Sequence, residues 1–446
     1  MRILSLFKPI LLASGLALLA SGAQTQDISP EAARTVAFQL LLDGRSDEAS
    51  DLSRVLIRRD AKDRIAWLAL AQAETLSGRY KPAFSAARRA WQLANTPEER
   101  YAASLVAARA LQSGGSLTRA QFWLRRAANE APNRPARAQA VGEFRRTRAA
   151  NPLTTRLDFS ITPSSNINNG ARSERVAGGT ISGPALALSG LAYHAAFRLS
   201  YKLPSQNGPS SRIGFSLQSR SYTLSDAAKI TSPASKNGDF AFQEAEVSHA
   251  SFWGKNAATS LTFRAGSNWS AGALLSHFGG ATVTRYAPIG QAGQLAFGAG
   301  VERIARQDNA ARSATLSRVF AQWSRGYANH NRLSLGASLA NSDSASVLTD
   351  HSLMSLTGRY SIANAPMGTL VDLSMSLEQR NYHQSLALFG QRQDQSVSIG
   401  VDITLKNKDY YGFAPTLGLS ARKTNSTVGL YDSETLGLRL GLRSVF

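Results

Sequence analysis

Hydrophobic and polar positions follow two different periods along this chain, and the change comes at Asn151-Pro152. Before this point Ala and Leu recur with the three-to-four spacing of amphipathic helices. After it Ser, Gly, Thr and Asn become frequent, and apolar residues often stand at every second position, which is the period of strands. The pattern predicts a helical domain over residues 24–152 followed by a β domain over residues 153–446.

The helical region contains an internal repeat. Gly44 and Gly78 lie 34 residues apart, and a third copy fits around Gly115. The middle copy matches the tetratricopeptide (TPR) pattern at Trp67, Leu70, Ala71, Gly78, Tyr80, Ala83 and Ala90. An ordinary antiparallel helical bundle is the alternative, but the period and the residue types together favour three TPR-like repeats with a capping helix over residues 134–149.

The β region alternates strictly in several places. Leucines occupy the even positions from Leu436 to Leu442, with Gly and Arg between them, and the same alternation recurs in residues 396–405, 371–378 and 333–339. The length and the alternation of these segments are typical of tilted transmembrane β-strands. Counting from Thr155 predicts a 14-stranded antiparallel transmembrane β-barrel, with residues 267–312 the hardest stretch to divide.

A soluble β-sandwich also alternates, and the predicted connections help to separate the two folds. Most of them alternate between short and long, which is expected of an outer-membrane barrel. The long ones are residues 164–189, 223–239, 341–351, 380–394 and 423–433. The first is also a candidate plug for the lumen. Aromatic residues near the predicted strand ends are typical of interfacial girdles: Tyr201, Tyr222, Trp323, Tyr360 and Tyr382.

An even strand number leaves both ends of the barrel on one side of the membrane, and short turns are typical of the periplasmic side. We therefore expect the helical domain in the periplasm and the barrel in the outer membrane. Residues 1–23 fit a signal peptide, because Arg2 and Lys8 precede an apolar stretch and small residues allow cleavage after Ala23.

Composition narrows the chemistry further. The chain has 446 residues, a formal net charge of +20 and no cysteine, which excludes a disulfide framework and thiolate catalysis. Its arginines are scattered, so a solvated or lumenal surface is favoured over a nucleic-acid partner. Lumen-facing positions of the predicted strands include charges of both signs: Arg198, Lys202, Asp372, Glu378, Asp402, Arg439 and Arg443.

Motifs for an enzyme or a cofactor site are missing from the sequence. It has no phosphate-binding loop, no H-E-x-x-H motif, no EF-hand loop and no dinucleotide fingerprint. All six histidines lie in the β region without metal-ligand spacing. We expect no catalytic residues, no metal and no cofactor. A barrel hydrolase using His194 or His249 with a serine is the weaker alternative.

A specific series of segments joins the two regions. After the TPR-like repeats and Asn151-Pro152 come the strand Leu157–Ile161 and the segment Pro163-Ser164-Ser165-Asn166-Ile167-Asn168-Asn169. This series resembles the surface lipoprotein assembly modifier (Slam) family. The resemblance implies a periplasmic TPR domain and a fourteen-stranded outer-membrane barrel that helps surface lipoproteins or secreted proteins reach the cell surface. The terminal aromatic, Phe446, resembles the signal by which the barrel-insertion machinery recognises such barrels.

Partners expected for such a protein are a client lipoprotein or secreted protein, outer-membrane lipid and the insertion machinery. TPR ligands usually contact the concave face formed by the first helix of each repeat. The predicted client-binding residues are therefore Glu31, Arg34, Phe38, Leu41, Ile65, Leu68, Gln72, Thr75, Ala102, Leu105, Arg109 and Gln112. Some of them could instead pack against neighbouring helices. A polysaccharide-export porin and a general diffusion porin are the alternative functions.

Overall fold

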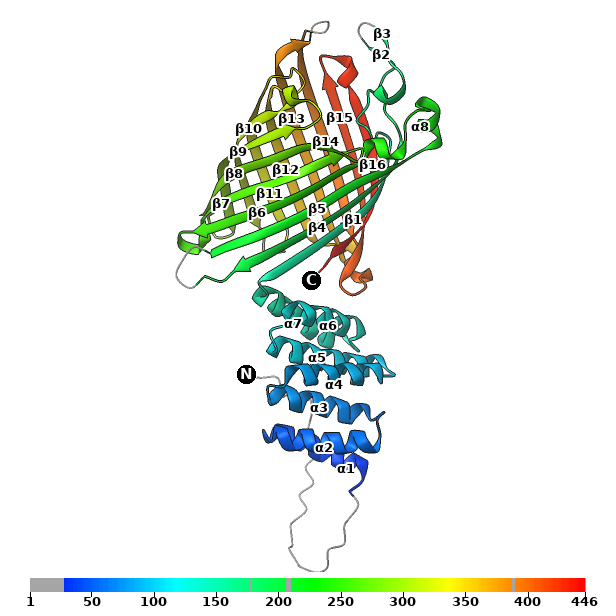
Figure 1. Cartoon of the computed structure of the whole chain (residues 1–446), viewed down its shortest axis with the longest axis vertical. Coiled ribbons are helices and arrows are strands. Elements are labelled where there is room, and N and C mark those ends of the chain that lie inside the picture. Colours follow the sequence, from blue (N-terminus) through cyan, green and yellow to red (C-terminus); the bar gives the residue numbers. More distant parts are fainter. Residues whose placement is uncertain (1–27, 177–178, 206–209, 387–389, 446) are drawn as a thin grey trace, which may run out of the picture. The chain divides into compact units, whose positions relative to one another are not determined.

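The computed structural model describes residues 28–176, 179–205, 210–386 and 390–445 (Figure 1). The predicted signal peptide over residues 1–23 and the terminal Phe446 lie outside these ranges. The chain forms two compact units that divide after Leu93. Each unit is described by itself below.

Seven α-helices precede the first strand in the described part of the chain. Four belong to the first unit: α1 (Pro30–Leu42), α2 (Ser46–Arg59), α3 (Arg64–Leu76) and α4 (Tyr80–Gln92). Three belong to the second unit: α5 (Pro97–Ser113), α6 (Leu117–Glu130) and α7 (Arg134–Ala150). Successive helices form the hairpins α1–α2, α3–α4 and α5–α6, and α7 comes last. The predicted TPR-like repeats are confirmed.

A glycine follows the first helix of each hairpin, and its backbone conformation explains why. Gly44, Gly78 and Gly115 have φ of +76°, +76° and +73°, a left-handed conformation that a side chain disfavours. The residue after each glycine donates its N–H to a carbonyl five residues earlier, as in the 2.9 Å bond from Arg45 to Leu40. This closure satisfies the last carbonyls of the helix and turns the chain into the second helix. The repeated glycine thus reflects a repeated turn.

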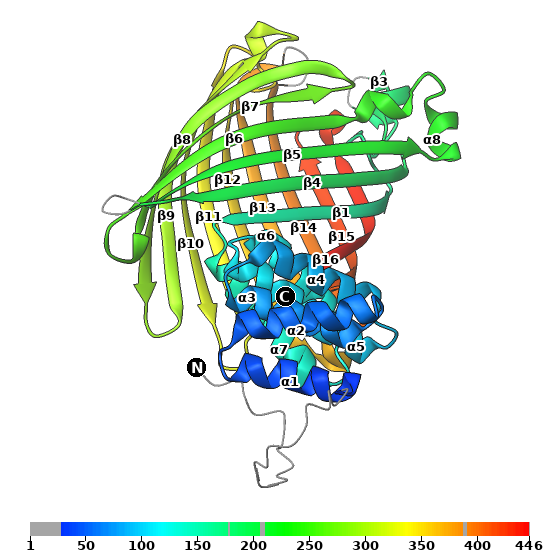
Figure 2. The same cartoon turned by 60° about the horizontal axis from the view of Figure 1, so that its bottom comes forward.

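Fourteen strands form a closed antiparallel barrel over the described residues (Figures 1 and 2). They are β1 (Leu153–Ser164), β4 (Gly190–Leu203), β5 (Ser210–Leu224), β6 (Phe242–Trp253), β7 (Thr259–Ser270), β8 (Ala273–Ile289), β9 (Gly293–Arg306), β10 (Ala314–Gly326), β11 (Arg332–Ser344), β12 (His351–Ala365), β13 (Thr369–Leu386), β14 (Gly390–Thr404), β15 (Phe413–Ser426) and β16 (Ser433–Ser444). Neighbours in the chain pair with each other, and β1 pairs with both β4 and β16. The predicted strand number and fold class are confirmed.

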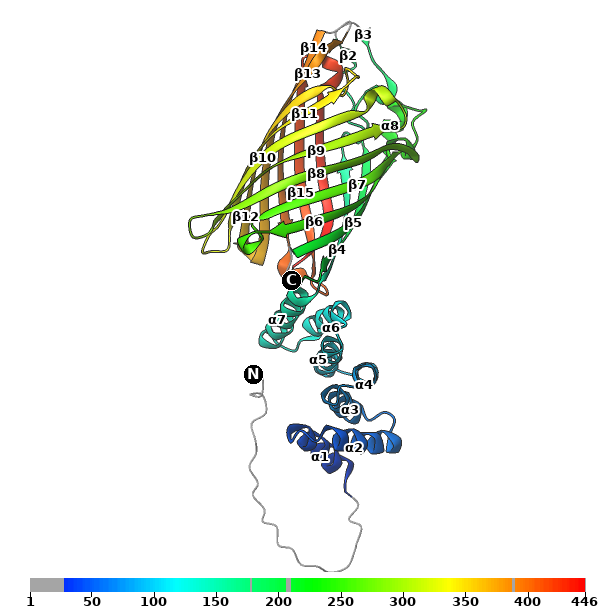
Figure 3. The same ribbon diagram turned by 60° about the vertical axis from the view of Figure 1, so that its left-hand side comes forward.

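Side chains alternate between the two faces of the barrel wall. Leu436, Leu438, Leu440 and Leu442 on β16 point outward and are 40–56% exposed, and β13 and β14 carry matching outward rows. These rows form the apolar outer wall of the barrel. Figures 2 and 3 show the strands of the barrel from two further directions. The intervening positions face the lumen. We call the end where β1 begins the proximal end and the end where β1 stops the distal end.

Strand lengths at the distal end differ from the prediction. Residues 380–394 do not form a long loop, because β13 continues to Leu386 and β14 begins at Gly390. Polar side chains occupy both faces of this extension, so its sequence lacks alternation although its backbone remains paired. The connection between β7 and β8 is also short, since Ala271 (φ 51°) and Gly272 (φ 81°) alone make the turn. The predicted alternation of long and short connections is therefore incomplete.

Two of the five predicted girdle aromatics are misplaced. Tyr201, Trp323 and Tyr360 share the outward register of the apolar rows. Tyr222 and Tyr382 fall on the lumen register, and Tyr382 is 3% exposed. A position near a strand end does not decide which face of the barrel wall a side chain takes. The alternation of residues along the strand decides it. Among the described helices, none is long and apolar enough to cross a bilayer.

Substitution by alanine should have opposite effects at two helical-domain glycines. Gly78→Ala should lower the free energy of unfolding by about 1–2 kcal/mol, because alanine resists the left-handed φ although its Cβ has open space there. Gly142→Ala within α7, where the φ is ordinary, should raise it by about 0.5–1 kcal/mol. Thermal unfolding followed by the helical circular dichroism signal measures both. Destabilisation by both variants would contradict this backbone explanation.

Candidate functional site

The first unit holds the predicted client-binding residues of α1 and α3. Glu31 is exposed, and the half-buried members are Arg34, Phe38, Leu41, Ile65, Gln72 and Thr75. Leu68 is 8% exposed, so most of its side chain packs among the helices. α3 buries residues over most of its circumference, from Ala66 to Glu74, whereas α1 buries only Ala33 and Ala37. Helical spacing alone could not show how wide the buried arc of α3 is.

Arg34 has a structural contact that the sequence did not reveal. Its Nε donates to Asp63 Oδ2 at 2.9 Å, and Asp63 Oδ1 accepts the N–H of Ala66 at 3.0 Å. Asp63 is therefore the cap of α3 and also the partner of a residue on α1. Arg34 ties α1 to the beginning of α3, so a substitution there would alter the repeat itself.

A buried carboxylate joins the first helical hairpin to the second. Glu74 on α3 is fully buried and accepts hydrogen bonds from Ser50 Oγ (2.7 Å), Arg54 (2.7 Å) and Arg79 Nε (2.5 Å). Burial alone would raise the pKa of Glu74, but these three donors outweigh it and hold the pKa below its usual value. The carboxylate thus links α2, α3 and the residue before α4 as a charged group.

The second unit holds the four predicted residues of α5. Ala102 and Leu105 are half-buried, and Arg109 is exposed. Gln112 donates from Nε2 to Thr147 Oγ1 on α7 at 2.6 Å, so its side chain is engaged within the helical layer. Arg109 is the exposed cation of the predicted set on this helix.

Helices α6 and α7 are attached to the barrel within the second unit. Arg125 donates to the carbonyl of Tyr411 (2.8 Å) and to Ser444 Oγ (2.9 Å), and lies over the rings of Phe144 and Phe413. Burial lowers the pKa of Arg125 to about 10, which still leaves it charged at neutral pH. The sequence contained no motif for this attachment.

A second attachment reinforces the first. Arg137 on α7 donates to Asp409 Oδ1 at 2.6 Å, and Asn129 Oδ1 accepts the N–H of Tyr411 at 3.4 Å. Both contacts end in the connection between β14 and β15 at the proximal end. The helix pair is therefore fixed to the C-terminal strands of the barrel by side chains, and to β1 by the chain itself.

Charges of both signs line the lumen and are paired across strands. Arg439 bonds Asp402, Arg443 bonds Asp372, and Arg422 bonds Glu378 at 2.8 Å. On the other side Arg198 bonds Asp158 at 3.2 Å. The ladder register puts the seven charges predicted for the lumen on the face opposite the exposed leucines. This wall is therefore polar and extensively neutralised.

Glycine gives these ion pairs room to cross an intervening strand. Gly418 on β15 lies between Asp402 on β14 and Arg439 on β16. A Cβ at this position would lie 2.2 Å from the Asp402 carboxylate and 3.1 Å from the Arg439 guanidinium. Gly418 therefore leaves space for the ion pair between Asp402 and Arg439 to pass over β15.

The distal mouth of the lumen contains a polar pocket of about 390 Å³. Arg380, Arg392 and Arg422 line it together with Glu378 and Asp394. Arg392 bonds Asp394 at 2.6 Å and lies 3.2 Å from the ring centroid of Tyr431. Asn169, from the segment predicted as a plug, also lines this pocket, so that segment reaches the mouth.

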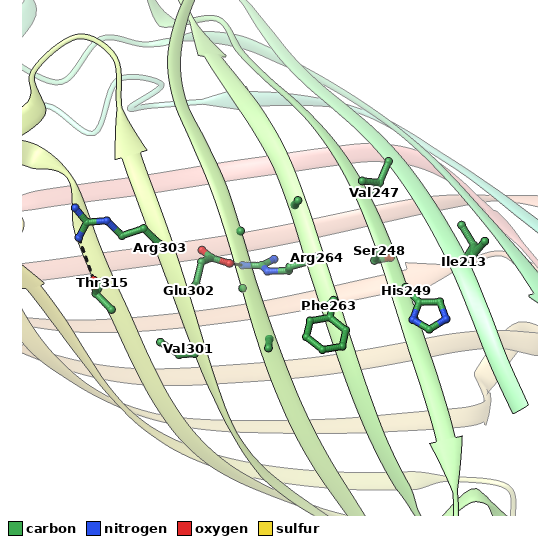
Figure 4. A pocket seen from close by; sticks show the side chains of 14 residues that line it. Ile213, Val247, Ser248, His249, Phe263, Arg264, Val301, Glu302, Arg303 and Thr315 are labelled. Atoms are coloured by element: carbon green, nitrogen blue, oxygen red, sulfur yellow. Dashed lines mark hydrogen bonds and ion pairs between the residues drawn. The ribbon is translucent and has the colours of Figure 1, made fainter. Parts of the chain in front are cut away.

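A larger recess of about 720 Å³ lies on the outer wall over β5 to β10 (Figure 4). Small residues, Ala265, Gly279 and Ala281, interrupt the row of bulky side chains there. Arg303 bonds Thr315 Oγ1 at 3.0 Å across two neighbouring strands beside it (Figure 4). The lining is mostly apolar and faces outward, as expected of a wall covered by lipid chains.

The two histidines of the hydrolase alternative lie on opposite faces of the barrel wall. His194 faces the lumen and His249 faces outward. Ser267 Oγ lies 2.8 Å from His277 Nδ1 on the outer wall, but over the described chain no carboxylate orients that ring. The triad arrangement needs such an orienting partner. The same residues contain no cluster of metal-ligating side chains.

Helical repeats of the TPR type followed by a closed fourteen-stranded barrel with an apolar outer wall define a barrel of the outer-membrane class. A family model described as surface lipoprotein assembly modifier matches residues 155–443. The chain belongs to this family. Among curated proteins, no relative matches the chain.

Solved structures are similar to parts of the chain. The Yersinia enterocolitica type III secretion translocator chaperone SycD is 19% identical, with 29% of this chain and 96% of that chain covered and a TM-score of 0.25. Pseudomonas putida OprB is 10% identical, with 68% and 96% covered and a TM-score of 0.38. The KdgM porin is 12% identical, with 47% and 94% covered and a TM-score of 0.28.

Removing the buried charge of Glu74 should destabilise the packing of the first two helical hairpins in a pH-dependent way. Glu74→Gln should lower the free energy of unfolding at pH 7 by about 1.5–3 kcal/mol, because it weakens charge-assisted hydrogen bonds to a buried group. Since the folded pKa lies below the usual 4.5, the wild-type advantage is complete above that pH and declines as the pH falls through the folded pKa. Thermal unfolding between neutral and acidic pH tests this, and a constant difference would contradict it.

Proposed function

We propose that this protein is an outer-membrane translocation and assembly factor through which client lipoproteins or secreted proteins reach the cell surface. The observation that carries the proposal is the family match, which spans the barrel from residue 155 to residue 443. The closed wall, apolar outside and charged inside, supports a passage for polar polypeptide across lipid.

The helical repeats take the role of client binding in this proposal. In this proposal they lie in the periplasm. Two features support this side: an even-stranded barrel has both ends of its chain on one side of the membrane, and the short turns of such barrels are typical of the periplasmic side. Repeat arrays of this type present extended surfaces to other polypeptides. The predicted residues of α1, α3 and α5 are the candidate contacts, and all of them except Leu68 are exposed or half-buried.

A deletion of the gene tests the function directly. Lipoproteins labelled by a membrane-impermeant biotin reagent on intact cells are compared between wild-type, deletion and complemented strains. We expect at least one lipoprotein to lose surface labelling in the deletion strain, to remain present in total lysate, and to regain labelling on complementation. Unchanged labelling of all lipoproteins and secreted proteins, together with high conductance of the purified barrel in planar bilayers, would support a diffusion or polysaccharide porin instead.

One exposed cation on α5 provides a residue-level test. Arg109→Glu should reduce surface labelling of the client severalfold without changing the amount of folded barrel, because it reverses a charge on the predicted concave face. Arg88→Glu is the matched control, since Arg88 is exposed on α4, the second helix of its hairpin. Equal labelling in the two variants would reject α5 as a client contact. Arg34 is unsuitable for this purpose because it is bonded to Asp63.

A further inference from the structure

The polar pocket at the distal mouth takes its charges from three neighbouring strands. Glu378 and Arg380 come from β13, Arg392 and Asp394 from β14, and Arg422 from β15. All five stand at even positions, which face the lumen on these strands, opposite the outward apolar rows. The other residues that line the pocket are uncharged, so its wall carries one positive charge in excess.

Arg392 is fixed on several sides and forms part of the wall. Its guanidinium donates to the two carboxylate oxygens of Asp394 at 2.9 Å and 2.6 Å. The same group lies 4.4 Å from the ring centroid of Tyr382 and 3.2 Å from that of Tyr431. Only 11% of the Arg392 side chain is exposed. Arg392 and Asp394 are therefore committed to each other, and the pair adds no net charge to the pocket.

Arg380 is the cation in excess. Glu378, the second carboxylate of the pocket, bonds Arg422 at 2.8 Å. Asp394 lies opposite Arg380 in the ladder, but both of its oxygens are already taken. Over the described residues, Arg380 Nε is buried and has no hydrogen-bond acceptor. The chain positions outside the described ranges between residues 28 and 445 include no aspartate or glutamate. A buried donor without an acceptor is unfavourable, and an anion in the pocket would supply the acceptor.

Uncharged polar groups complete the pocket. Ser396 and Thr424 bring hydroxyl oxygens that lie 2.8 Å apart, and Ser433 adds a third hydroxyl from β16. Hydroxyls donate as well as accept, so they can bond the polar groups next to a bound anion. The excess charge thus lies within a hydrogen-bonding surface.

The Asn-Ile-Asn segment that carried the family resemblance forms one side of this pocket. Asn166 is 4% exposed, and its side chain both donates to the carbonyl of Gly170 and accepts the Gly170 N–H, each at 3.0 Å. Asn168 donates to the carbonyl of Leu186 at 2.8 Å, and a Cβ on Gly170 would lie 2.2 Å from the same carbonyl oxygen. Asn169, in the fixed turn between them, has a φ of 53°, which asparagine tolerates. The turn thereby holds Asn169 at the pocket wall.

The charge balance of the pocket selects a monoanion. A carboxylate neutralises the excess charge, whereas a phosphate monoester with two charges would leave the pocket negative beside Glu378 and Asp394. A guanidinium binds a carboxylate through two parallel hydrogen bonds. The volume of about 390 Å³ lies at the lower end of the range for ligand pockets, which is about 300–1,000 Å³. This space suits one side chain together with its nearest backbone.

We infer that the pocket binds one carboxylate of the client polypeptide, an aspartate or glutamate side chain, with Arg380 as its partner. The hydroxyls and Asn169 bond the backbone beside that side chain. The inference rests on the proposed function, because it gives the polypeptide a binding site where the passage opens at the distal mouth.

Binding of a defined probe tests the pocket without knowledge of the client. Purified full-length protein in detergent is titrated with the end-blocked peptide Gly-Ser-Glu-Ser-Gly, labelled with an uncharged fluorophore, and with versions that carry glutamine or lysine at the centre. Fluorescence anisotropy should show the glutamate peptide binding about tenfold more tightly than either version. Equal binding of the glutamate and glutamine peptides to the wild type would overturn the inference.

Two arginine variants locate the site. Arg380→Gln should reduce the affinity for the glutamate peptide about tenfold, to the level of the glutamine peptide. Arg359→Gln is the matched control, since Arg359 faces the lumen from β12 opposite Ser374 and lies outside the pocket. Equal loss of affinity in both variants would show a general effect of lumen charge and overturn the site. Asn169→Gly keeps the left-handed φ and removes the amide, so it should weaken binding severalfold even if Arg380→Gln failed to fold; unchanged binding would overturn the role of the turn.

Competition identifies the source of the anion. N-acetylglutamine methyl ester should not displace the labelled glutamate peptide, whereas acetate and N-acetylglutamate methyl ester should. Stronger displacement by glucuronate than by the glutamate derivative would assign the pocket to an acidic sugar and overturn the polypeptide ligand. Stronger displacement by inorganic phosphate than by acetate at pH 8 would overturn the selection of a monoanion.

Failure of the proposed function has a different signature. If complementation with the wild-type gene restores no lipoprotein or secreted protein to the surface, the function fails, whereas peptide binding still decides the pocket. Where complementation does restore display, Arg380→Gln should lower surface biotinylation severalfold relative to Arg359→Gln at equal amounts of folded barrel. Equal display by these two variants would overturn the assignment of the pocket to the client.

Discussion

A polypeptide in hydrocarbon has to satisfy its own backbone hydrogen bonds, and this constraint organises the whole β region. It requires a sheet without free edges, which fourteen antiparallel strands provide by closing β16 onto β1. Closure also divides the side chains into an outer set that contacts lipid and an inner set that contacts water. The leucine rows of β16 and the ion pairs of the lumen are two consequences of the same closure.

The lumen holds many charged side chains close to a wall of low dielectric constant. Pairing Arg439 with Asp402 and Arg443 with Asp372 cancels charge locally and braces strands that are not direct neighbours. Gly418 permits one of these contacts by leaving the sheet surface bare between the partners. The helical region uses the same device on a smaller scale, since buried Glu74 is surrounded by donors from two other segments.

Period and turn chemistry were sufficient to predict the architecture. The two-residue alternation identified the barrel and its strand number, and the spaced glycines identified the repeats, because each pattern is a local consequence of backbone geometry. Alternation fails where both faces meet water, so the extension of β13 and β14 was missed. Burial of Leu68, the Arg34–Asp63 contact and the attachment through Arg125 depend on residues far apart in sequence, which spacing within one helix cannot reveal.

The attachment of α6 and α7 has a mechanical consequence. Through Arg125 and Arg137 the pair grips the β14–β15 connection and the end of β16, and through Asn151-Pro152 it continues into β1. The same two helices are therefore connected to both strands that meet where the barrel closes. A tilt of α6 and α7, for instance under load from a bound polypeptide, would therefore shift β1 and β16 along each other. The other strands of the barrel would keep their pairing.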